Sequence, residues 1–273
     1  MSYQSVCLAD SPNFLFLLNE TSGNFTDQGS HGFTGTAHAT ITYSVNTGFA
    51  GQPKGITISA GGYISIPDPA GFINSTTVSW EFVLAYTSST ATSPFVMAKG
   101  FDGTSGYGIF LNPSRQLGID LTGTSVLWAS GYAMPNDGTA RHYVVTLNGT
   151  TKTLYENAVQ KVQNTTGSGS VGGSGSEYEI GAFKNNTTPG QQPFNGATIS
   201  CVSMYPSVLS STQVNAHFNA LSSSGTGATI KSPPGQFVAA MAHERNIERK
   251  QGQGGPSGPV RGRDLSSVLR KHR

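Results

Sequence analysis

Hydrophobic and polar residues alternate along several short segments of the chain, the pattern of extended strands with one buried face. The clearest case places Val78, Trp80 and Phe82 on one side, while Ser79 and Glu81 face the other way. The same period of two recurs in residues 56–66, 117–121, 143–147 and 199–205. In the last of these segments, one face is expected to hold Ile199, Cys201, Ser203 and Tyr205. The repetition predicts a sheet of short, half-buried antiparallel strands.

Turn-forming residues separate these segments. Asn148-Gly149 lies between two alternating segments and is a strong hairpin signal, because both residues tolerate the left-handed backbone of a tight turn. Asn112-Pro113 and Asn136-Asp137-Gly138 mark further turns. Residues 164–176 are rich in Gly and Ser and are expected to form a surface loop, since the strand pattern resumes at Tyr178.

A single helix is expected within the domain. Ser210 and Gln213 have the spacing of a capping box, in which two side chains bond the free backbone N–H groups at a helix start. Val214, Phe218 and Leu221 follow at helical spacing and would form the buried face. The domain is expected to end with this helix.

Composition supports a folded all-β domain. Charged residues make up only 11% of the chain, aromatic residues 10%, and there are 35 glycines. A disordered chain would instead combine high charge with few aromatic residues. The predicted fold class is therefore an antiparallel β-sandwich with one short helix and an extended C-terminal arm.

Charge divides the chain into two parts. Residues 1–230 carry seven Lys and Arg against eleven Asp and Glu, a net charge of −4. Residues 231–273 carry nine against three, a net charge of +6. We expect residues 1–221 to form the domain, 222–235 a linker, and 236–273 a basic C-terminal arm.

The arm combines basic residues with two short amphipathic segments. We interpret it as a partner-binding arm, whose apolar side chains insert into a neighbouring protein while its basic side chains meet an acidic rim. A nucleic-acid partner is disfavoured, because acidic and apolar residues interrupt the positive charge and no aromatic stacking platform is present. The alternative is a disordered solubilising tail. The residues assigned to partner binding are Phe237, Met241, Ile247, Arg249, Lys250, Leu265, Val268, Leu269 and Arg270.

No membrane insertion is expected, because no stretch approaches the roughly 20 apolar residues of a membrane helix. The first residues lack the basic segment and apolar run of a secretory signal peptide. Cys7 and Cys201 are then expected to be unreactive, partly buried thiols, with a disulfide between them as the alternative. Two cysteines alone do not make a zinc site.

Four groups of segments follow one another along the chain: Leu17–Gly23 with Thr26–Ser30 and Gly32–Gly35; Gly62–Pro67 with Val78–Phe82; His142–Gly149 with Leu154–Asn157; and Phe194–Tyr205 with Leu209–Gln213. Their order and spacing resemble the laminin-G-like, concanavalin A-like jelly roll of lectins and glucanases. The resemblance spans about residues 3 to 221 and implies a jelly-roll β-sandwich.

The opening of the chain adds a narrower resemblance. Residues 6–12, Val-Cys-Leu-Ala-Asp-Ser-Pro, lead into Leu-Asn-Glu-Thr-Ser-Gly at residues 18–23. This order is similar to jelly-roll proteins of tailed bacteriophages known as minor tail proteins. It implies a non-enzymatic virion structural protein, of the tail or the head-decoration type, which assembles in the host cytoplasm. Other virion proteins would be its partners, and it could form a homo-oligomer.

Two alternative functions stay open. One is a carbohydrate-binding module that attaches to glycans of the host surface, and the other, which is disfavoured, is a glycoside hydrolase. For carbohydrate binding, exposed aromatic and amide side chains are the usual contacts. The candidates are Tyr107, Trp128, Tyr132 and the Asn185-Asn186 loop.

Candidate catalytic residues are few. Glucanases of the resembled fold use closely spaced carboxylates, and the nearest match is Glu177 and Glu179, which alternation places on one strand face. We interpret these two as solvated strand positions rather than an acid/base pair. Glu81 is expected to be an outward-facing structural residue, His142 to pack, and His217 to face solvent. No catalytic residue is assigned.

No metal site or cofactor is assigned either. Asp27 lies in the loop where some laminin-G-like domains bind calcium, but a calcium ion takes six to eight oxygens and no dense acidic cluster accompanies Asp27. A turn-forming role for Asp27 is preferred, with calcium binding as the alternative.

Overall fold

A computed structural model describes residues 1–67, 75–87, 93–100, 106–121, 124–127, 131–165, 171, 177–185 and 188–223 of the chain. Two helices lie within these residues, α1 (Tyr3–Ala9) and α2 (Ser211–Ser222). The strands are β1 (Phe14–Phe16), β2 (Phe25–Thr26), β3 (Thr34–Asn46), β4 (Lys54–Ile66), β5 (Thr77–Ala85), β6 (Phe95–Lys99), β7 (Tyr107–Leu111), β8 (Leu117–Leu121), β9 (Thr124–Leu127), β10 (Arg141–Asn148), β11 (Thr151–Glu156), β12 (Val159–Asn164), β13 (Tyr178–Ile180), β14 (Phe183–Asn185), β15 (Thr188–Gln191) and β16 (Thr198–Tyr205).

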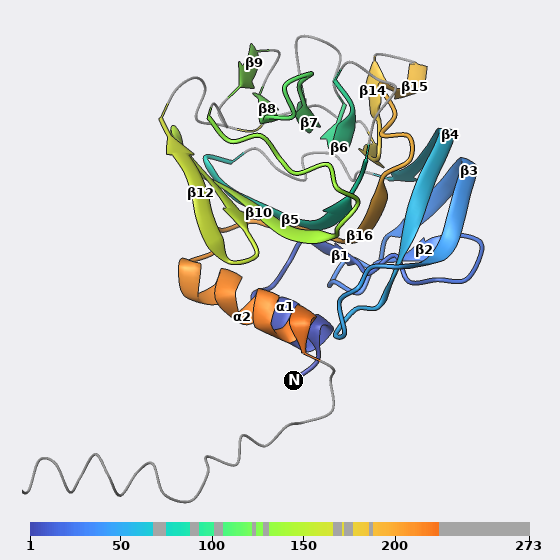
Figure 1. The fold of residues 1–273 in the computed structure, drawn as a ribbon, viewed down its shortest axis with the longest axis horizontal. Helices are drawn as coiled ribbons and strands as arrows, with labels where there is room; N and C mark the ends of the chain where they lie inside the picture. Colours follow the sequence, from blue (N-terminus) through green and yellow to red (C-terminus); the bar gives the residue numbers. More distant parts are fainter. Residues whose placement is uncertain are drawn as a thin grey trace, which may run out of the picture. The chain divides into compact units, whose positions relative to one another are not determined.

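The large antiparallel sheet folds over on itself into two layers (Figure 1). One layer contains β12, β11, β10, β5 and β16, and the other contains β13, β6, β7, β8 and β9. β4 joins the layers, because Ile56 and Thr57 pair with β16 whereas Ile64–Ile66 pairs with β13. A separate two-stranded sheet is formed by β14 and β15. The predicted antiparallel β-sandwich is confirmed.

The core lies between the two layers and is filled by the alternate residues that the sequence pattern predicts. Trp80, Phe82 and Ile64 are completely buried there. Burial of each such side chain contributes about 1.5–3 kcal/mol. The prediction of half-buried strands is wrong for β5, in which every residue from Val78 to Ala85 is buried. Its second face is covered because both helices lie against the outside of this layer.

Both helices lie on the same side of the sandwich, below β5, β10 and β16 in Figure 1. The predicted capping box of α2 is confirmed, since the Ser210 and Gln213 side chains each bond the other's backbone N–H. The prediction of a single helix is wrong. α1 is only seven residues long, too short to show a helical period, although the Ser2 side chain caps its start. Neither described helix has the length and apolar character needed to cross a bilayer.

A β-bulge in β16 reverses the faces that simple alternation predicts. The pairing of β16 with β5 shifts register between Ser200 and Ser203, and Cys201 adopts a positive φ of 53°. Val202 and Met204 therefore join the core between the layers. The predicted common face of Ile199, Cys201, Ser203 and Tyr205 is wrong: Ile199 stays in the core, and the other three face the helices.

The turn predictions can be compared with the strands directly. The Asn148-Gly149 hairpin is confirmed, because Asn148 of β10 pairs with Thr151 of β11 and Gly149 has a φ of +57°. Strand pattern does resume at Tyr178, the first residue of β13. Most of the predicted loop at residues 164–176 lies outside the described residues.

Candidate functional site

The outer face of the helix-covered layer carries a buried polar cluster centred on Glu81 of β5. One carboxylate oxygen, Oε1, accepts hydrogen bonds from the Tyr3 hydroxyl at 2.9 Å and from His142 Nε2 at 2.7 Å. The other, Oε2, accepts from the Tyr205 hydroxyl at 2.7 Å and from His217 Nδ1 at 2.9 Å. The Glu81 cluster comprises Tyr3, Glu81, His142, Ser203, Tyr205 and His217, and all six side chains are buried.

His217 lies between two carboxylates. Its Nδ1 is bonded to Glu81, and its Nε2 lies 2.8 Å from Oδ2 of Asp10, the residue after α1. Because carboxylates only accept hydrogen bonds, both ring nitrogens donate and the imidazole is positively charged. Burial alone would lower the pKa of His217, but the negative charge of Glu81 raises it to about 11.

The positive charge of His217 in turn stabilises the negative charge of Glu81. Burial opposes ionisation, yet the charge of His217 and the hydrogen bonds from His142 and His217 hold the pKa of Glu81 well below its usual range. Removing one member of such a buried ion pair leaves the charge of the other without a partner, and this lowers stability far more than breaking an ion pair on the surface. The Glu81 cluster therefore holds α1 and α2 against the sheet.

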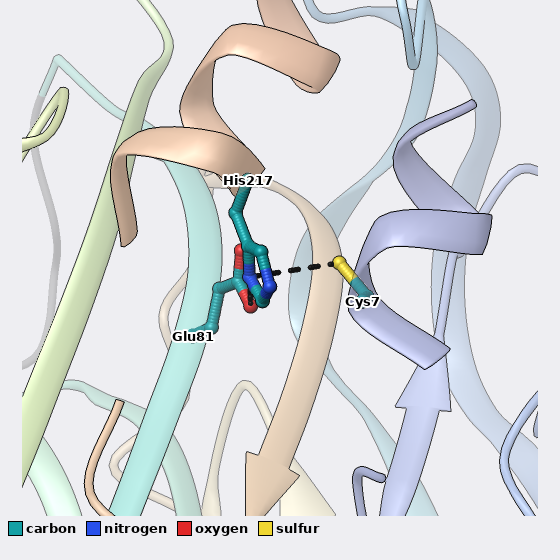
Figure 2. A group of neighbouring side chains, drawn as sticks. All are labelled: Cys7, Glu81 and His217. Carbon is teal, nitrogen blue, oxygen red and sulfur yellow. Dashed lines mark hydrogen bonds and ion pairs between the residues drawn. The ribbon is translucent and has the colours of Figure 1, made fainter. Parts of the chain in front are cut away.

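Two cysteines border this cluster. Cys7 of α1 and Cys201 of β16 are both buried free thiols, so the disulfide alternative is not formed. Cys7 Sγ lies 3.8 Å from His217 Nδ1, and Figure 2 shows the imidazole reaching from α2 between Cys7 and Glu81. Burial raises the pKa of Cys7 to about 11 and raises that of Cys201 further.

Cys7, His217 and Asp10 have the order of a thiol, a base and an orienting carboxylate. Two features oppose nucleophilic chemistry there. The Cys7 side chain is completely buried, and its raised pKa disfavours the reactive thiolate. His217 Nδ1 also donates to Glu81 and so has no lone pair with which to take the thiol proton.

Two expectations about these residues are wrong. Glu81 does not face solvent, and neither does His217, because the sheet face and the helix face that carry them are packed together. The sequence did contain a signal for the burial of His217, because it lies three residues after Val214 and four before Leu221, on the same face of the helix. His142 packs as expected, stacked on the Phe218 ring with a 6.0 Å centroid distance.

A second group of polar side chains lies on the outer face of the opposite side of the sandwich. Strand register places Ser65 of β4 opposite Glu179 of β13, and Tyr63 opposite His38 of β3. These four side chains share the face opposite Ile64 and the rest of the core, because successive residues of a strand alternate. They define the outer-face patch: His38, Tyr63, Ser65 and Glu179.

Contacts within the outer-face patch are close. The His38 and Tyr63 rings stack with centroids 4.4 Å apart, and His38 Nε2 lies 2.8 Å from the Ser65 hydroxyl. Both rings are partly exposed. Gly190 of β15 covers the edge of the patch, where a Cβ would come within 2.9 Å of the Tyr63 ring. The patch therefore combines an accessible aromatic surface with polar groups.

Glu179 is the buried acid of the patch. Its Oε2 accepts a hydrogen bond from the Gly190 N–H at 3.1 Å, whereas Oε1 has no hydrogen-bond partner. Burial raises the pKa of Glu179 to about 7. The interpretation of a solvated strand position is thus wrong for Glu179. Glu177 is partly exposed as expected, but it lies just before β13 rather than in the strand, and it forms an ion pair with Lys184 at 2.9 Å.

The remaining candidates fall in different places. Asp27 is a turn former as preferred: Oδ1 accepts from the backbone N–H of Leu15 at 2.8 Å and of Gly29 at 2.7 Å. Tyr107 is not a surface residue, because it is completely buried and its hydroxyl donates to that of Tyr178. Tyr132 is half-buried, with its hydroxyl bonded to Glu156.

Other predicted residues lie outside the described part of the chain. These are Trp128, Asn186, and the side chain of Asn185. The arm and all but residues 222–223 of the linker lie outside it as well, so the predicted domain limits and partner-binding residues stay predictions.

Sequence comparison identifies a superfamily. The profile described as the concanavalin A-like lectin/glucanases superfamily matches residues 59–215, more than half of the chain. No curated protein sequence matches the chain.

Solved structures share the fold at low sequence identity. Trypanosoma rangeli sialidase has a TM-score of 0.52 at 14% identity, over 78% of this chain, which spans only 33% of the sialidase. Domain 4 of the Geobacillus stearothermophilus arabinanase AbnA, in complex with arabinotriose, has 0.52 at 18%, covering 76% of this chain and 98% of that domain. The binding domain of Botulinum neurotoxin DC in complex with SialylT has 0.57 at 11%, covering 78% and 52%.

Proposed function

Because the chain belongs to the concanavalin A-like lectin/glucanases superfamily, we propose that its β-sandwich is a non-catalytic carbohydrate-binding module. The outer-face patch is its binding surface. The observation that carries the proposal is the partly exposed Tyr63–His38 stack beside Glu179, a buried carboxyl with one unpartnered oxygen. Sugar sites typically combine an aromatic surface with a few placed polar groups.

Similar structures support a binding role. The arabinanase domain was solved with arabinotriose and the neurotoxin binding domain with SialylT, and both share this fold. A shared fold alone does not transfer a ligand. The patch therefore supplies the local chemistry that the fold comparison lacks.

The spacing of acidic residues favours binding over glycoside hydrolysis. Hydrolases of this kind need two carboxyls about 5–5.5 Å or about 6.5–9.5 Å apart. Register links Glu179 to Asp120 through β6 and β7, which makes three strand spacings of about 4.8 Å, or about 14 Å. Glu81 is enclosed by hydrogen bonds. Glu177, the acid two residues before Glu179, is paired with Lys184 at 2.9 Å. The outer-face patch itself thus contains one acid rather than a pair.

Glycan-array screening of the full-length protein, followed by calorimetry with the best ligand, tests the proposal. Tyr63→Ala is expected to weaken binding about tenfold or more, equivalent to about 1.4 kcal/mol, by removing the aromatic surface. Tyr43→Ala is the matched control, because Tyr43 is also partly exposed and stacks on Phe25 at 5.5 Å outside the patch. Equal loss in both variants, or no glycan binding by the wild type, contradicts the proposal.

A second element of the proposal concerns the C-terminal arm. We infer that the arm attaches the sandwich to a larger particle, as in a tail or head-decoration protein of a bacteriophage virion. The supporting observation is the charge contrast between residues 1–230 at −4 and residues 231–273 at +6. Truncation after Ser224 is expected to abolish co-purification with phage structural proteins while circular dichroism still reports a folded sandwich. Retained association would place the interface on the sandwich instead.

A further inference from the structure

Three potential metal ligands of different chemical type converge inside the Glu81 cluster. Cys7 Sγ, a Glu81 carboxylate oxygen and a His217 ring nitrogen all lie within 4.8 Å of one another, and all three residues are buried. They come from α1, β5 and α2, three elements far apart in sequence, and Figure 2 shows them pointing toward one common point. Nothing in the carbohydrate-binding proposal uses these residues.

We propose that Cys7, Glu81 and His217 bind a divalent metal ion of the zinc class. Zinc takes a mixed set of sulfur, nitrogen and oxygen ligands, at about 2.3 Å from sulfur and about 2.0–2.2 Å from nitrogen and oxygen. Tetrahedral geometry then separates the ligand atoms by about 3.5 Å. Cys7 Sγ lies 3.8 Å from His217 Nδ1, while Nδ1 and Glu81 Oε2 are 2.9 Å apart and would separate slightly as the metal replaces their shared proton.

The surroundings already orient the ligands. Metal-bound histidines generally donate their second ring N–H to a carboxylate, which fixes the ring and raises its basicity. Asp10 Oδ2 lies 2.8 Å from His217 Nε2 and leaves Nδ1 facing Glu81 and Cys7. Glu81 is held at Oε1 by Tyr3 and His142, so Oε2 keeps its direction toward His217.

Replacing two protons by one divalent metal ion leaves the net charge of this buried site unchanged. Without metal, Glu81 and Asp10 are negative, His217 is positive and Cys7 is a neutral thiol, so the group carries a net charge of −1. Metal binding removes one proton from the Cys7 thiol and one from the His217 imidazolium, and both protons leave to solvent. The dication replaces the two lost positive charges, and the net charge stays at −1. No uncompensated charge is created in the interior.

A bound ion would link both helices to the sheet, in contrast to the sequence-based expectation of no metal. Because the site is buried, loading requires the ion during folding. The full-length protein is therefore unfolded in denaturant and refolded with Co²⁺ alone or Zn²⁺ alone. The expected results are a thiolate-to-cobalt charge-transfer band in the near ultraviolet, a higher Tm with Zn²⁺, and, compared with refolding without metal, two more protons released per bound ion.

Cys7→Ser is expected to abolish the cobalt band and the zinc-dependent rise in Tm. Cys201→Ser is the matched control, because Cys201 is also buried beside the cluster but is not one of the three ligands, and it should retain both signals. Asp10→Asn should weaken zinc binding about 10–100-fold. Absence of bound metal in the refolded wild type, a band that persists in Cys7→Ser, or equal losses in both serine variants would overturn the proposal.

Discussion

Two buried glutamates on the two outer faces of the sandwich differ in how completely they are satisfied. Glu81 receives hydrogen bonds from two tyrosines, two histidines and Ser203, and its pKa is held low. Glu179 receives one from the Gly190 N–H and keeps one oxygen without a partner, and its pKa rises to about 7. The two buried carboxyls therefore have opposite pKa shifts, because Glu81 has the positive charge of His217 and several hydrogen-bond donors beside it, whereas Glu179 has one backbone donor.

The two faces therefore have different roles. On the helix-covered face, the polar groups bond α1 and α2 to the sheet, so the buried Glu81 contributes to stability. In the outer-face patch, one oxygen of Glu179 has no hydrogen-bond partner beside the partly exposed Tyr63 ring. A buried polar atom without a partner lowers stability and is typical of ligand-binding or catalytic sites.

Replacing Glu81 should produce the largest effect. Glu81→Gln removes the buried negative charge that His217 pairs with and leaves Asp10 as the one carboxylate bonded to the imidazolium. The expected loss of unfolding free energy is about 3–5 kcal/mol, measured by urea denaturation at pH 7. Glu179→Gln is the matched control and should keep or gain stability, since Glu179 ionises unfavourably at that pH. Comparable losses in both variants would remove the distinction between the faces.

The second prediction concerns pH. The pKa of Glu179 is raised from 4.5 to about 7, so its stabilising contribution is complete below about pH 4.5 and is lost as pH rises through about 7. Wild-type protein should therefore lose stability on the order of 2 kcal/mol across this window relative to Glu179→Gln. The measurement is the difference in unfolding free energy between the two proteins at each pH. If the difference in unfolding free energy does not vary with pH, the pKa of Glu179 is not raised by folding.

The third prediction tests how tightly β15 covers the patch. Gly190 has a φ of +70°, and a Cβ there would meet the Tyr63 ring at 2.9 Å. Gly190→Ala should cost about 1–2 kcal/mol from backbone strain, together with a change in the near-ultraviolet circular dichroism of Tyr63. Gly149→Ala is the control, because Gly149 has a φ of +57° and nothing within 4 Å, so it reports strain alone. Unaltered spectra in Gly190→Ala would mean that Gly190 does not press on Tyr63.

The smallest effect is expected at the start of α2. Ser210→Ala removes the capping box and should lower the unfolding free energy by about 1 kcal/mol, because the helix that carries His217 loses bonds at its first turn. Ser211→Ala alters the neighbouring exposed position inside the helix and should change little. Thermal unfolding of the two variants side by side provides the check, and similar midpoints would count against a stabilising cap.

Much of the architecture was readable from local pattern. Alternation identified β5, β8 and β10, the Asn148-Gly149 pair identified a hairpin, and Ser210 with Gln213 identified the start of α2. These signals work because the side-chain period of a strand, the φ of a turn and the geometry of a cap depend only on neighbouring residues.

The candidate sites needed the tertiary structure. Glu81 and His217 are 136 residues apart, and nothing local shows that a sheet face will be covered by two helices or that a histidine will be enclosed between Glu81 and Asp10. Glu179 was predicted on the correct strand but with the wrong exposure, because local alternation does not show that β15 contacts its carboxyl. The sequence by itself determined the strands, turns and charge distribution, whereas burial and protonation depended on contacts between distant segments.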